Sequence, residues 1–375
     1  MPARLRDRAP RRVKLDNGED AVVMEGRPIH RIGFTRISGV PRDQWHHQVP
    51  TYDGGLGTGG PEQRLREQDQ DGVEAEVLFA HAGYVNLWQG IRGTDNFEAL
   101  VHAYNEFLIE DYASAAPDRL LTLGIIPPTS IDAAVAELEF CARAGFKGIA
   151  LYRFPSGKAY PTTEDDRFWA AALDLGMPVC SHTGGGSTRF TDKGPSFLYP
   201  KNDAEKGDPI VQVLRFGSDI PFAPLQLAYM GVFDRFPKLR IYWAETQIGW
   251  MPSTFMQIDD NYERYKYLHR DLYGLNWLER PPSEYLRDNN LWGFLGDRFG
   301  VAHRQEIGLG CLMWGSDFAH AASDWPHSRE LIDRTFEGVP PAERHQLLAG
   351  NAAEFFRLDN AAPTSTTEES QHVYA

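Results

Sequence analysis

From residue 76 onward, short apolar runs alternate with longer amphipathic stretches along the chain. The runs are rich in Val, Ile, Leu and aromatic residues, which is typical of strands that are buried on both faces. The seven predicted strands cover 76–80, 121–126, 148–153, 178–182, 240–245, 290–295 and 311–317. Gly, Pro and polar residues border most of them, as expected at strand ends.

Amphipathic helices are predicted between and after these strands. They cover 96–115, 131–144, 163–175, 222–236, 252–267 and 341–356. Asp132, Thr163 and Pro341 lie near expected helix starts, and Gly145 and Gly176 near expected ends. A repeated strand–helix unit predicts a parallel sheet in an α/β protein, and these units have the size found in (β/α)8 TIM barrels.

Two segments interrupt this rhythm, and the chain ahead of it has a pattern of its own. The stretch 183–208 follows a strand end and predicts a long loop over the catalytic face, while 268–289 predicts a lid or a subunit contact. Ahead of the barrel, Asn17-Gly18 predicts a hairpin turn. We therefore expect an N-terminal hairpin and loop region at 1–70, a barrel at 71–358 and a disordered tail at 359–375.

Composition narrows the class of partner. The net charge of -14 and the pI of about 5.3 argue against nucleic acid and anionic membranes, which require clustered Lys and Arg. The one basic run, at 1–12, is expected to be a solvated terminus. Three cysteines suit a reducing cytoplasm, and no apolar run approaches the ~18 residues of a membrane span. We expect a cytoplasmic protein that acts on a small molecule.

Three predicted strands end in residues that can bind a metal or carry a proton. His182 ends one strand, Glu245 another and Asp317 a third. Active sites of (β/α)8 barrels are built at the carboxyl ends of the strands, so these side chains are expected to converge. An imidazole with carboxylates is a competent ligand set for Zn or a similar divalent ion.

The segment MWGSDFAHAASDWPHS at 313–328 resembles a conserved stretch of amidohydrolase-related proteins. Four further segments resemble landmarks of the same branch, in their usual order. They are DGVEAEVLF at 71–79, VCSHTGGG at 179–186, FPKLRIYWAETQIGWMP at 236–252 and LLAGNAAEFF at 347–356. The chain therefore resembles the amidohydrolase superfamily, in the branch that includes aminocarboxymuconate semialdehyde decarboxylase and resorcylate decarboxylase.

The resemblance implies roles for the strand-end residues. His182 corresponds to a metal ligand, and Asp317 to a ligand that also transfers a proton. Many relatives have a His where this chain has Glu245, which we expect to orient a metal-bound water or to bind substrate. His320 is expected to hydrogen-bond a ligand or the substrate. A divalent metal is implied, with zinc expected and manganese as the alternative.

The resemblance also implies an opening strand that ends in a His-x-His or Glu-x-His pair. The sequence ahead of residue 76 contains no such pair, and the Glu-x-His at Glu343–His345 lies in the last predicted helix. We therefore expect this strand to lie upstream of Met1, in roughly 20 further residues. If Met1 is the genuine start, a metal-free and inactive barrel is the alternative.

Two reactions remain open for such a site, hydrolysis and decarboxylation of a small aromatic or unsaturated carboxylic acid. Both use a metal, and both use Asp317 for proton transfer. Arg153 and Arg189 are the candidate partners of a substrate carboxylate, although a salt bridge at the barrel rim explains Arg153 equally well. Trp250, Trp314 and Trp325 are candidates for lining a ring pocket, although Trp in a barrel more often serves packing.

Other classes of barrel fit less well. A flavin or sugar-phosphate barrel would need a Gly-rich phosphate loop after the late strands, and no convincing one occurs there. A homodimer is the expected assembly, because two-fold dimers are the commonest soluble oligomers.

Overall fold

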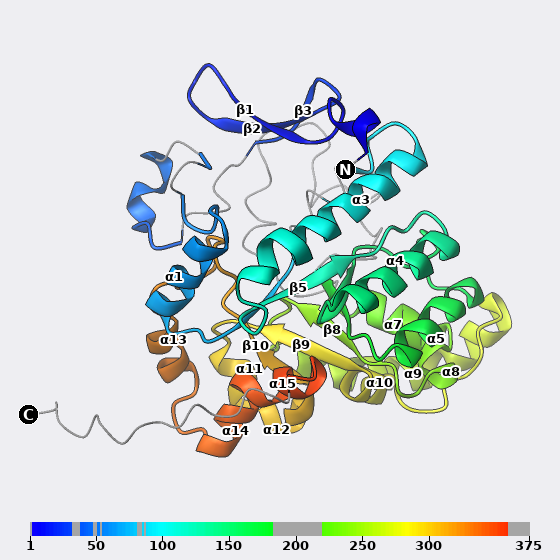
Figure 1. Ribbon diagram of the computed structural model, residues 1–375. Coiled ribbons are helices and arrows are strands. Elements are labelled where there is room, and N and C mark those ends of the chain that lie inside the picture. The colour runs from blue at the N-terminus through cyan, green and yellow to red at the C-terminus, as the bar shows by residue number, and fades with distance from the viewer. Residues whose placement is uncertain are drawn as a thin grey trace, which may run out of the picture.

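The computed structural model describes residues 2–31, 38–47, 51–52, 55–80, 85, 88–182 and 220–358 (Figure 1). Its centre is a parallel sheet of seven strands in the order β10-β9-β8-β7-β6-β5-β4. The strands are β4 (Glu76–Leu78), β5 (Leu120–Ile125), β6 (Gly148–Leu151), β7 (Val179–His182), β8 (Ile241–Ala244), β9 (Asn290–Phe294) and β10 (Leu312–Trp314). All seven predicted strands are confirmed.

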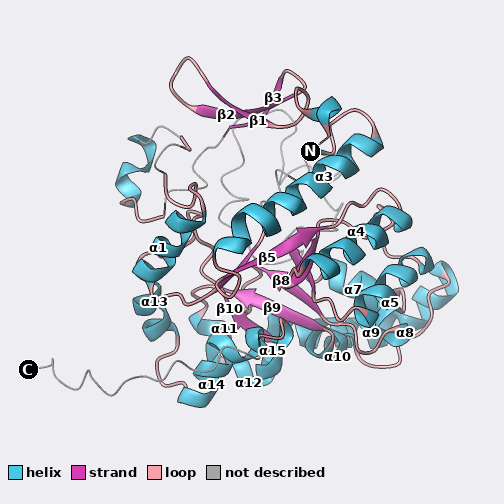
Figure 2. Cartoon of the chain, viewed as in Figure 1, coloured by secondary structure: helices cyan, strands magenta, loops and turns pink. Residues whose placement is uncertain are grey.

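The sheet curls around an apolar interior, and helices cover its outer face (Figure 2). Alternate side chains point inward, including Leu123, Ala150, Cys180 and Met313. The intervening side chains, such as Trp292, pack outward against the helices. This arrangement confirms the prediction of a TIM-barrel-like α/β fold.

The strands β4 and β10 form the two edges of this sheet, and the described residues supply no strand between them. The prediction of an opening strand upstream of Met1 stays a prediction. A side-chain hydrogen bond links the β4 edge to a strand inside the sheet. The hydroxyl of Tyr152, just after β6, donates to the carbonyl of Ala80, just after β4.

The helices follow the strands as predicted, with some additions. They are α1 (Pro61–Asp71), α3 (Thr94–Phe107), α4 (Ile131–Ala144), α5 (Asp166–Asp174), α7 (Phe222–Tyr229), α8 (Val232–Arg235), α9 (Met251–Tyr273), α10 (Pro282–Asp288), α11 (Arg298–Ala302), α12 (Arg304–Ile307), α13 (Ser328–Thr335), α14 (Pro341–His345) and α15 (Asn351–Phe355). Among the described residues, none of them combines the length and apolarity that crossing a lipid bilayer requires.

Short helical turns extend or connect these elements. They are η1 (Ala3–Leu5), η3 (Arg42–His47), η4 (Leu108–Tyr112), η5 (Ala113–Ala115), η6 (Thr163–Asp165), η7 (Leu309–Cys311) and η8 (Gln346–Gly350). The turns η4 and η5 continue α3 to the predicted end of that helix. The helix predicted at 222–236 is divided into α7 and α8, because Gly231 adopts a left-handed conformation (φ 68°) between them.

Local sequence explains where α4 begins and ends. The Ser130 side chain accepts a hydrogen bond from the backbone N–H of Ala133 at 3.1 Å, which caps the first turn. Gly145 ends the helix in the left-handed conformation (φ 92°), which suits a residue without a Cβ.

The region ahead of the barrel forms a separate antiparallel sheet, seen at the top of Figure 1. It contains β1 (Arg11–Lys14), β2 (Asp20–Met24) and β3 (Arg27–Arg31), and the β1–β2 hairpin confirms the turn predicted at Asn17-Gly18. The helix α1 crosses the predicted boundary at residue 70, and the division of the chain into domains stays a prediction.

Two predicted segments lie wholly outside the described residues. The loop predicted at 183–208 and the tail at 359–375 are not among them. The segment 268–289 is described and contains the end of α9 and all of α10. Its role as a lid or subunit contact stays a prediction.

Leu→Ala substitutions inside the sheet and on the surface are expected to differ strongly in their effect on the free energy of unfolding. Leu123 is fully buried inside the sheet, whereas Leu272 on α9 is 65% exposed. We expect Leu123→Ala to lower the free energy of unfolding by about 2–5 kcal/mol, because it leaves a cavity. Leu272→Ala should change it by less than about 0.5 kcal/mol. Urea unfolding followed by circular dichroism measures both, and equal losses would contradict the assignment of Leu123 to the core.

Candidate active site

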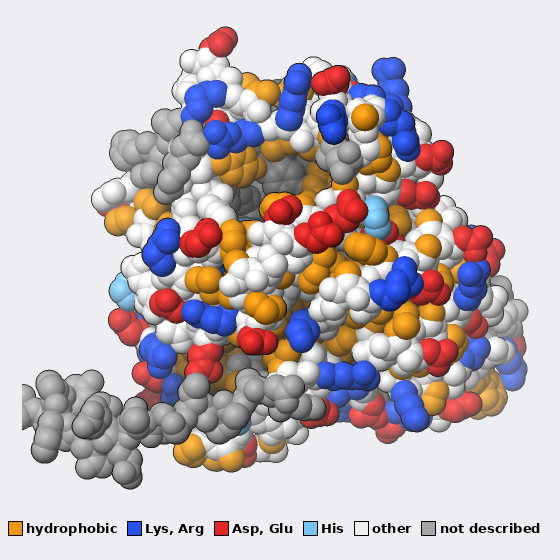
Figure 3. Space-filling view, in the orientation of Figure 1, with side chains coloured by type: hydrophobic (Ala, Val, Ile, Leu, Met, Phe, Trp, Pro, Cys, Tyr) orange, Lys and Arg blue, Asp and Glu red, His pale blue; other side chains and the backbone are white. Residues whose placement is uncertain are grey.

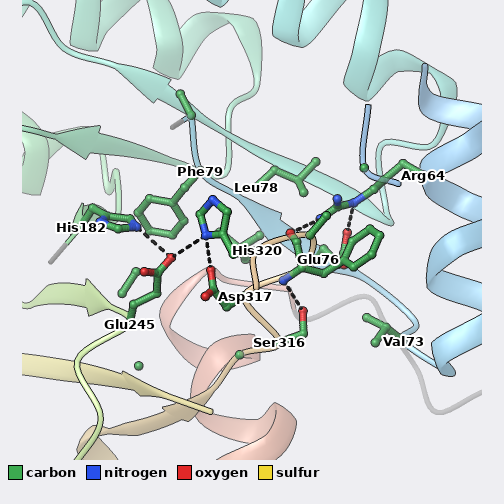
Figure 4. Close-up of a pocket in the computed structure, with 18 of the residues that line it drawn as sticks. Arg64, Val73, Glu76, Leu78, Phe79, His182, Glu245, Ser316, Asp317 and His320 are labelled. Atoms are coloured by element: carbon green, nitrogen blue, oxygen red, sulfur yellow. Dashed lines mark hydrogen bonds and ion pairs between the residues drawn. The ribbon is translucent and has the colours of Figure 1, made fainter. Parts of the chain in front are cut away.

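The three strand-end residues predicted from the sequence lie close together. His182 is the last residue of β7, Glu245 follows β8 directly, and Asp317 lies three residues after β10. The loop that carries Asp317 also carries His320. Because the carboxyl ends of parallel strands meet at one edge of a sheet, the four side chains converge there (Figure 4).

Hydrogen bonds and ion pairs join these four side chains. His182 Nε2 lies 2.9 Å from Glu245 Oε1, and His320 Nδ1 lies 2.6 Å from Asp317 Oδ1. His320 Nδ1 is also 3.7 Å from Glu245 Oε1. Each imidazole can therefore donate a hydrogen bond to a carboxylate, and His320 lies between the two carboxylates.

Burial and hydrogen bonding shift the pKa values of the cluster in different directions. The side chain of Asp317 is 3% exposed, and burial, opposed by the hydrogen bond with His320, raises its pKa to about 6. Burial alone would lower the pKa of His320, but its contacts with Asp317 and Glu245 outweigh this and raise it to about 10. Burial would likewise raise the pKa of Glu245, but hydrogen bonds with His182 and His320 hold it well below its usual range.

The backbone around both carboxylates is strained and firmly held. Glu245 and Asp317 both adopt left-handed conformations, with φ of 57° and 53°. Such a conformation costs about 1–3 kcal/mol in a non-glycine residue and persists where the surroundings impose it. Thr246 donates to the carbonyl of Gly293 through its backbone at 2.8 Å and its hydroxyl at 2.9 Å. The backbone of Gly315 donates to Phe294 at 2.9 Å.

The cluster suits a divalent metal ion. Asp317 Oδ2 is buried and receives no hydrogen bond from an N–H or hydroxyl donor in the described part of the chain, and the carboxylate of Glu245 interacts with the Asp317 carboxyl group. Atoms of Glu245, Asp317 and His320 lie within 4.8 Å of one another. Carboxylate oxygens and imidazole nitrogens are donors that zinc and manganese accept, so Glu245, Asp317 and His320 could hold an ion together, and His182 adjoins them through Glu245.

The cluster lies in the wall of a cavity of about 720 Å³. Both edge strands, β4 and β10, contribute to the wall. Aromatic rings also line the cavity, including those of Phe79 and Tyr242, whose centroids are 6.1 Å apart. The volume is sufficient for a small aromatic molecule.

A second cavity, of about 520 Å³, lies next to the first. Its lining includes Arg12 and Val22 from the antiparallel sheet and Tyr104 from α3. Figure 3 shows the surface hollowed between this sheet and α3. Because Tyr104 and Ala80 line both cavities, this hollow is adjacent to the space around the cluster.

The structure does not bring all of the predicted substrate contacts to the cavity. Arg153 is exposed and absent from the wall, and Arg189 lies outside the described residues. Trp325 is buried, and its indole N–H donates to the carbonyl of Glu67 at 3.0 Å, which is a packing role. Trp314 does line the cavity, whereas Trp250 packs on Trp292. Substrate contact by Arg153 or Trp325 has no support in this geometry.

An ion pair in the cavity wall was not predicted from the sequence. Arg64 Nε lies 2.6 Å from Glu76 Oε2, and both side chains are 11% exposed. Arg64 belongs to α1, a helix that the sequence analysis did not identify. A signal was present, because the helix starts with Pro61 and ends before Gly72, which has a left-handed conformation (φ 70°).

A curled parallel sheet with paired carboxylates and imidazoles at the carboxyl ends of its strands is typical of α/β-barrel enzymes that use a metal ion. Residues 43–358 match the family model described as Amidohydrolase, and the chain therefore belongs to the amidohydrolase family.

Several of the proteins to which the chain is similar are decarboxylases. The chain is 24% identical over 317 residues to a gamma-resorcylate decarboxylase of Polaromonas sp., which covers 80% of this chain and 87% of that protein. A solved dihydroxybenzoic acid decarboxylase of Polaromonas sp., with bound manganese and the inhibitor 2-nitroresorcinol, superposes with a TM-score of 0.60 and 21% identity over 86% of this chain and 92% of that one.

A second solved structure is more similar in shape. The amidohydrolase map2389c of Mycobacterium avium subsp. paratuberculosis superposes with a TM-score of 0.71 and 18% identity over 95% of this chain and 94% of that one. At these identities the solved structures establish the fold, and they agree with the barrel described above.

The cluster predicts that binding of Mn²⁺ depends on Asp317. We expect Asp317→Asn to weaken the affinity by at least roughly tenfold, since it removes the charge of a carboxylate in the site. Asp333→Asn is the matched control, because Asp333 is paired with Arg344 on the surface. Equilibrium dialysis measures the affinity, and unchanged binding by the Asp317 variant would contradict the assignment.

Proposed function

We propose that this protein is a metal-dependent decarboxylase of hydroxylated aromatic carboxylic acids. The observation that carries the proposal is Asp317, a buried carboxyl group in the wall of an aromatic-lined cavity. Glu245, His182 and His320 adjoin it. A proton donor beside a candidate metal site is what decarboxylation of such an acid requires.

Hydrolysis is the second candidate reaction, since it would use the same ligands and the same proton-transfer residue. The similarity to gamma-resorcylate decarboxylase favours decarboxylation, because it extends over 80% of this chain. The dihydroxybenzoic acid decarboxylase that contains manganese is similar over 86% of it. These relatives support an aromatic acid with a hydroxyl group beside the carboxylate as the substrate class.

When bound, a divalent cation would act as a Lewis acid toward the carboxylate and the adjacent hydroxyl oxygen of the substrate. His182, Glu245, Asp317 and His320 would hold it. Manganese is the first metal to test because of the similar enzyme that contains it, and zinc remains the alternative that the ligand set also suits.

Asp317 supplies the proton in this mechanism. Its carboxyl group protonates the ring carbon that carries the substrate carboxylate, which disrupts the aromaticity of the ring. The bond between that carbon and the carboxylate then breaks, its electron pair returns to the ring, and CO2 leaves. Asp317 is left as a carboxylate, and His320, at 2.6 Å, is placed to return a proton to it.

The remaining groups orient the reaction. Glu245 fixes the imidazole of His182 through a contact of 2.9 Å. The ring of Phe79 lies 6.2 Å from that of His182 and 6.1 Å from that of Tyr242, so an aromatic substrate would meet apolar surfaces on this side. These rings exclude water from the carbon that accepts the proton.

The proposal also includes a cytoplasmic location and a homodimer. The location is supported by the three cysteines, Cys141, Cys180 and Cys311, which are all free and buried. The dimer rests on the general frequency of two-fold assemblies.

Turnover of 2,6-dihydroxybenzoate tests the proposal directly. With Mn²⁺ bound, we expect the protein to release CO2 and form resorcinol, both measurable by chromatography and gas analysis. Asp317→Asn should lower kcat by about 10²–10⁴-fold, the usual contribution of a positioned acid. Asp333→Asn should leave kcat unchanged, because its side chain lies on α13 and is paired with Arg344.

Equal turnover by the wild type and Asp317→Asn would rule out Asp317 as the proton donor. Absence of turnover with 2,6-dihydroxybenzoate and related ortho-hydroxy acids, combined with hydrolysis of an ester or lactone, would count against decarboxylation and favour the hydrolase.

A further inference from the structure

The loop that carries Asp317 and His320 is held by residues far from it in sequence. Ser38 donates its hydroxyl to the carbonyl of His320 at 2.6 Å, and Ser38 is 2% exposed. Arg64 donates through Nη2 to the carbonyl of Phe318 at 3.2 Å. These two donors therefore contact the backbone on both sides of residue 319.

The side chain of Arg64 is itself held in place by other contacts, so its hydrogen bond to Phe318 comes from a fixed guanidinium group. Its Nε is 2.6 Å from Glu76 Oε2, and Glu76 also accepts a hydrogen bond from Gln68 at 2.9 Å. The guanidinium carbon lies 4.6 Å from the centroid of the Phe318 ring. Figure 4 shows Arg64 and Glu76 beside the loop.

Close packing reinforces these hydrogen bonds. A Cβ at Gly57, where φ is 65°, would lie 2.6 Å from the Cβ of Ala319. A Cβ at Gly39, where φ is 74°, would lie 2.8 Å from the ring of Trp325. Side chains at these two positions would push the loop away, so glycine permits the close approach.

We propose that Ser38 and Arg64 are positioning residues for the active site, which hold His320 and Asp317 in the geometry that the proposed function needs. The backbone contacts fix the loop at Phe318 and at His320 itself. The imidazole then stays 2.6 Å from Asp317 Oδ1 and 3.7 Å from Glu245 Oε1. Without the contacts, the loop moves and the distances lengthen.

Ser38→Ala is the principal test, and Ser38→Thr is the conservative variant. We expect Ser38→Ala to lower kcat for 2,6-dihydroxybenzoate about tenfold with little change in KM, because small displacements of a catalytic group cost rate. Ser38→Thr keeps the hydroxyl and should restore most of the rate. Ser114→Ala is the matched control, since Ser114 donates to the carbonyl of Glu110 at 2.6 Å and lies outside the cavity wall.

Arg64→Met tests the second contact in the same way. It removes the donors but keeps an unbranched apolar side chain, and Arg64→Lys retains the charge. Arg66→Met is its control, because Arg66 is exposed on the same helix. If Arg64→Met fails to fold, because Glu76 is left unpaired, the Ser38 variants decide the question.

Affinity for Mn²⁺ provides a readout that does not depend on the substrate. We expect Ser38→Ala to weaken it by about tenfold, an effect typical of residues that orient ligands. If the wild type turns over no ortho-hydroxy acid, the proposed function fails, and the change in affinity still tests positioning. The positioning proposal is overturned if Ser38→Ala retains both the wild-type affinity and kcat, or if Ser114→Ala loses as much as Ser38→Ala.

Discussion

The placement of two carboxylates in one buried cluster is the constraint on which the site depends. Glu245 and Asp317 would repel each other in surroundings of low dielectric constant, and hydrogen bonds with His182 and His320 offset this repulsion. The burial of Asp317 raises its pKa, whereas Glu245 stays ionised. A divalent cation would complete the neutralisation. Metal binding and proton transfer therefore depend on the same electrostatic arrangement.

The cluster also requires support from two parts of the chain. The sheet provides the first support. The backbone N–H groups of Thr246 and Gly315 donate hydrogen bonds to carbonyls of β9, and these bonds hold the nearby strained residues in place. The region ahead of the barrel provides the second, through the contacts of Ser38 and Arg64 with the loop after β10. This region is thus part of the active-site architecture, and its glycines allow it to approach the loop closely.

Sequence reasoning identified the strands, because buried strands are short, continuous apolar runs. It also identified His182, Glu245 and Asp317, because each is a polar residue at the end of such a run. It did not identify α1, whose low apolar content conceals its contact with the barrel. It also proposed Arg153 and Trp325 as substrate contacts from their positions near strand ends or motifs. Side-chain direction decides such contacts, and here Arg153 is exposed while Trp325 packs against the N-terminal region.

The sequence by itself determined the alternation of strands and helices, the identity of the residues at the strand ends and the resemblance to the amidohydrolases. These properties follow from local patterns, since burial fixes which residues a strand can contain. Only the tertiary structure decided which carboxylate pairs with which imidazole, how burial shifts each pKa and which distant residues hold the His320 loop. Such properties depend on distances between segments up to 282 positions apart, as Ser38 and His320 are, and no local pattern contains them.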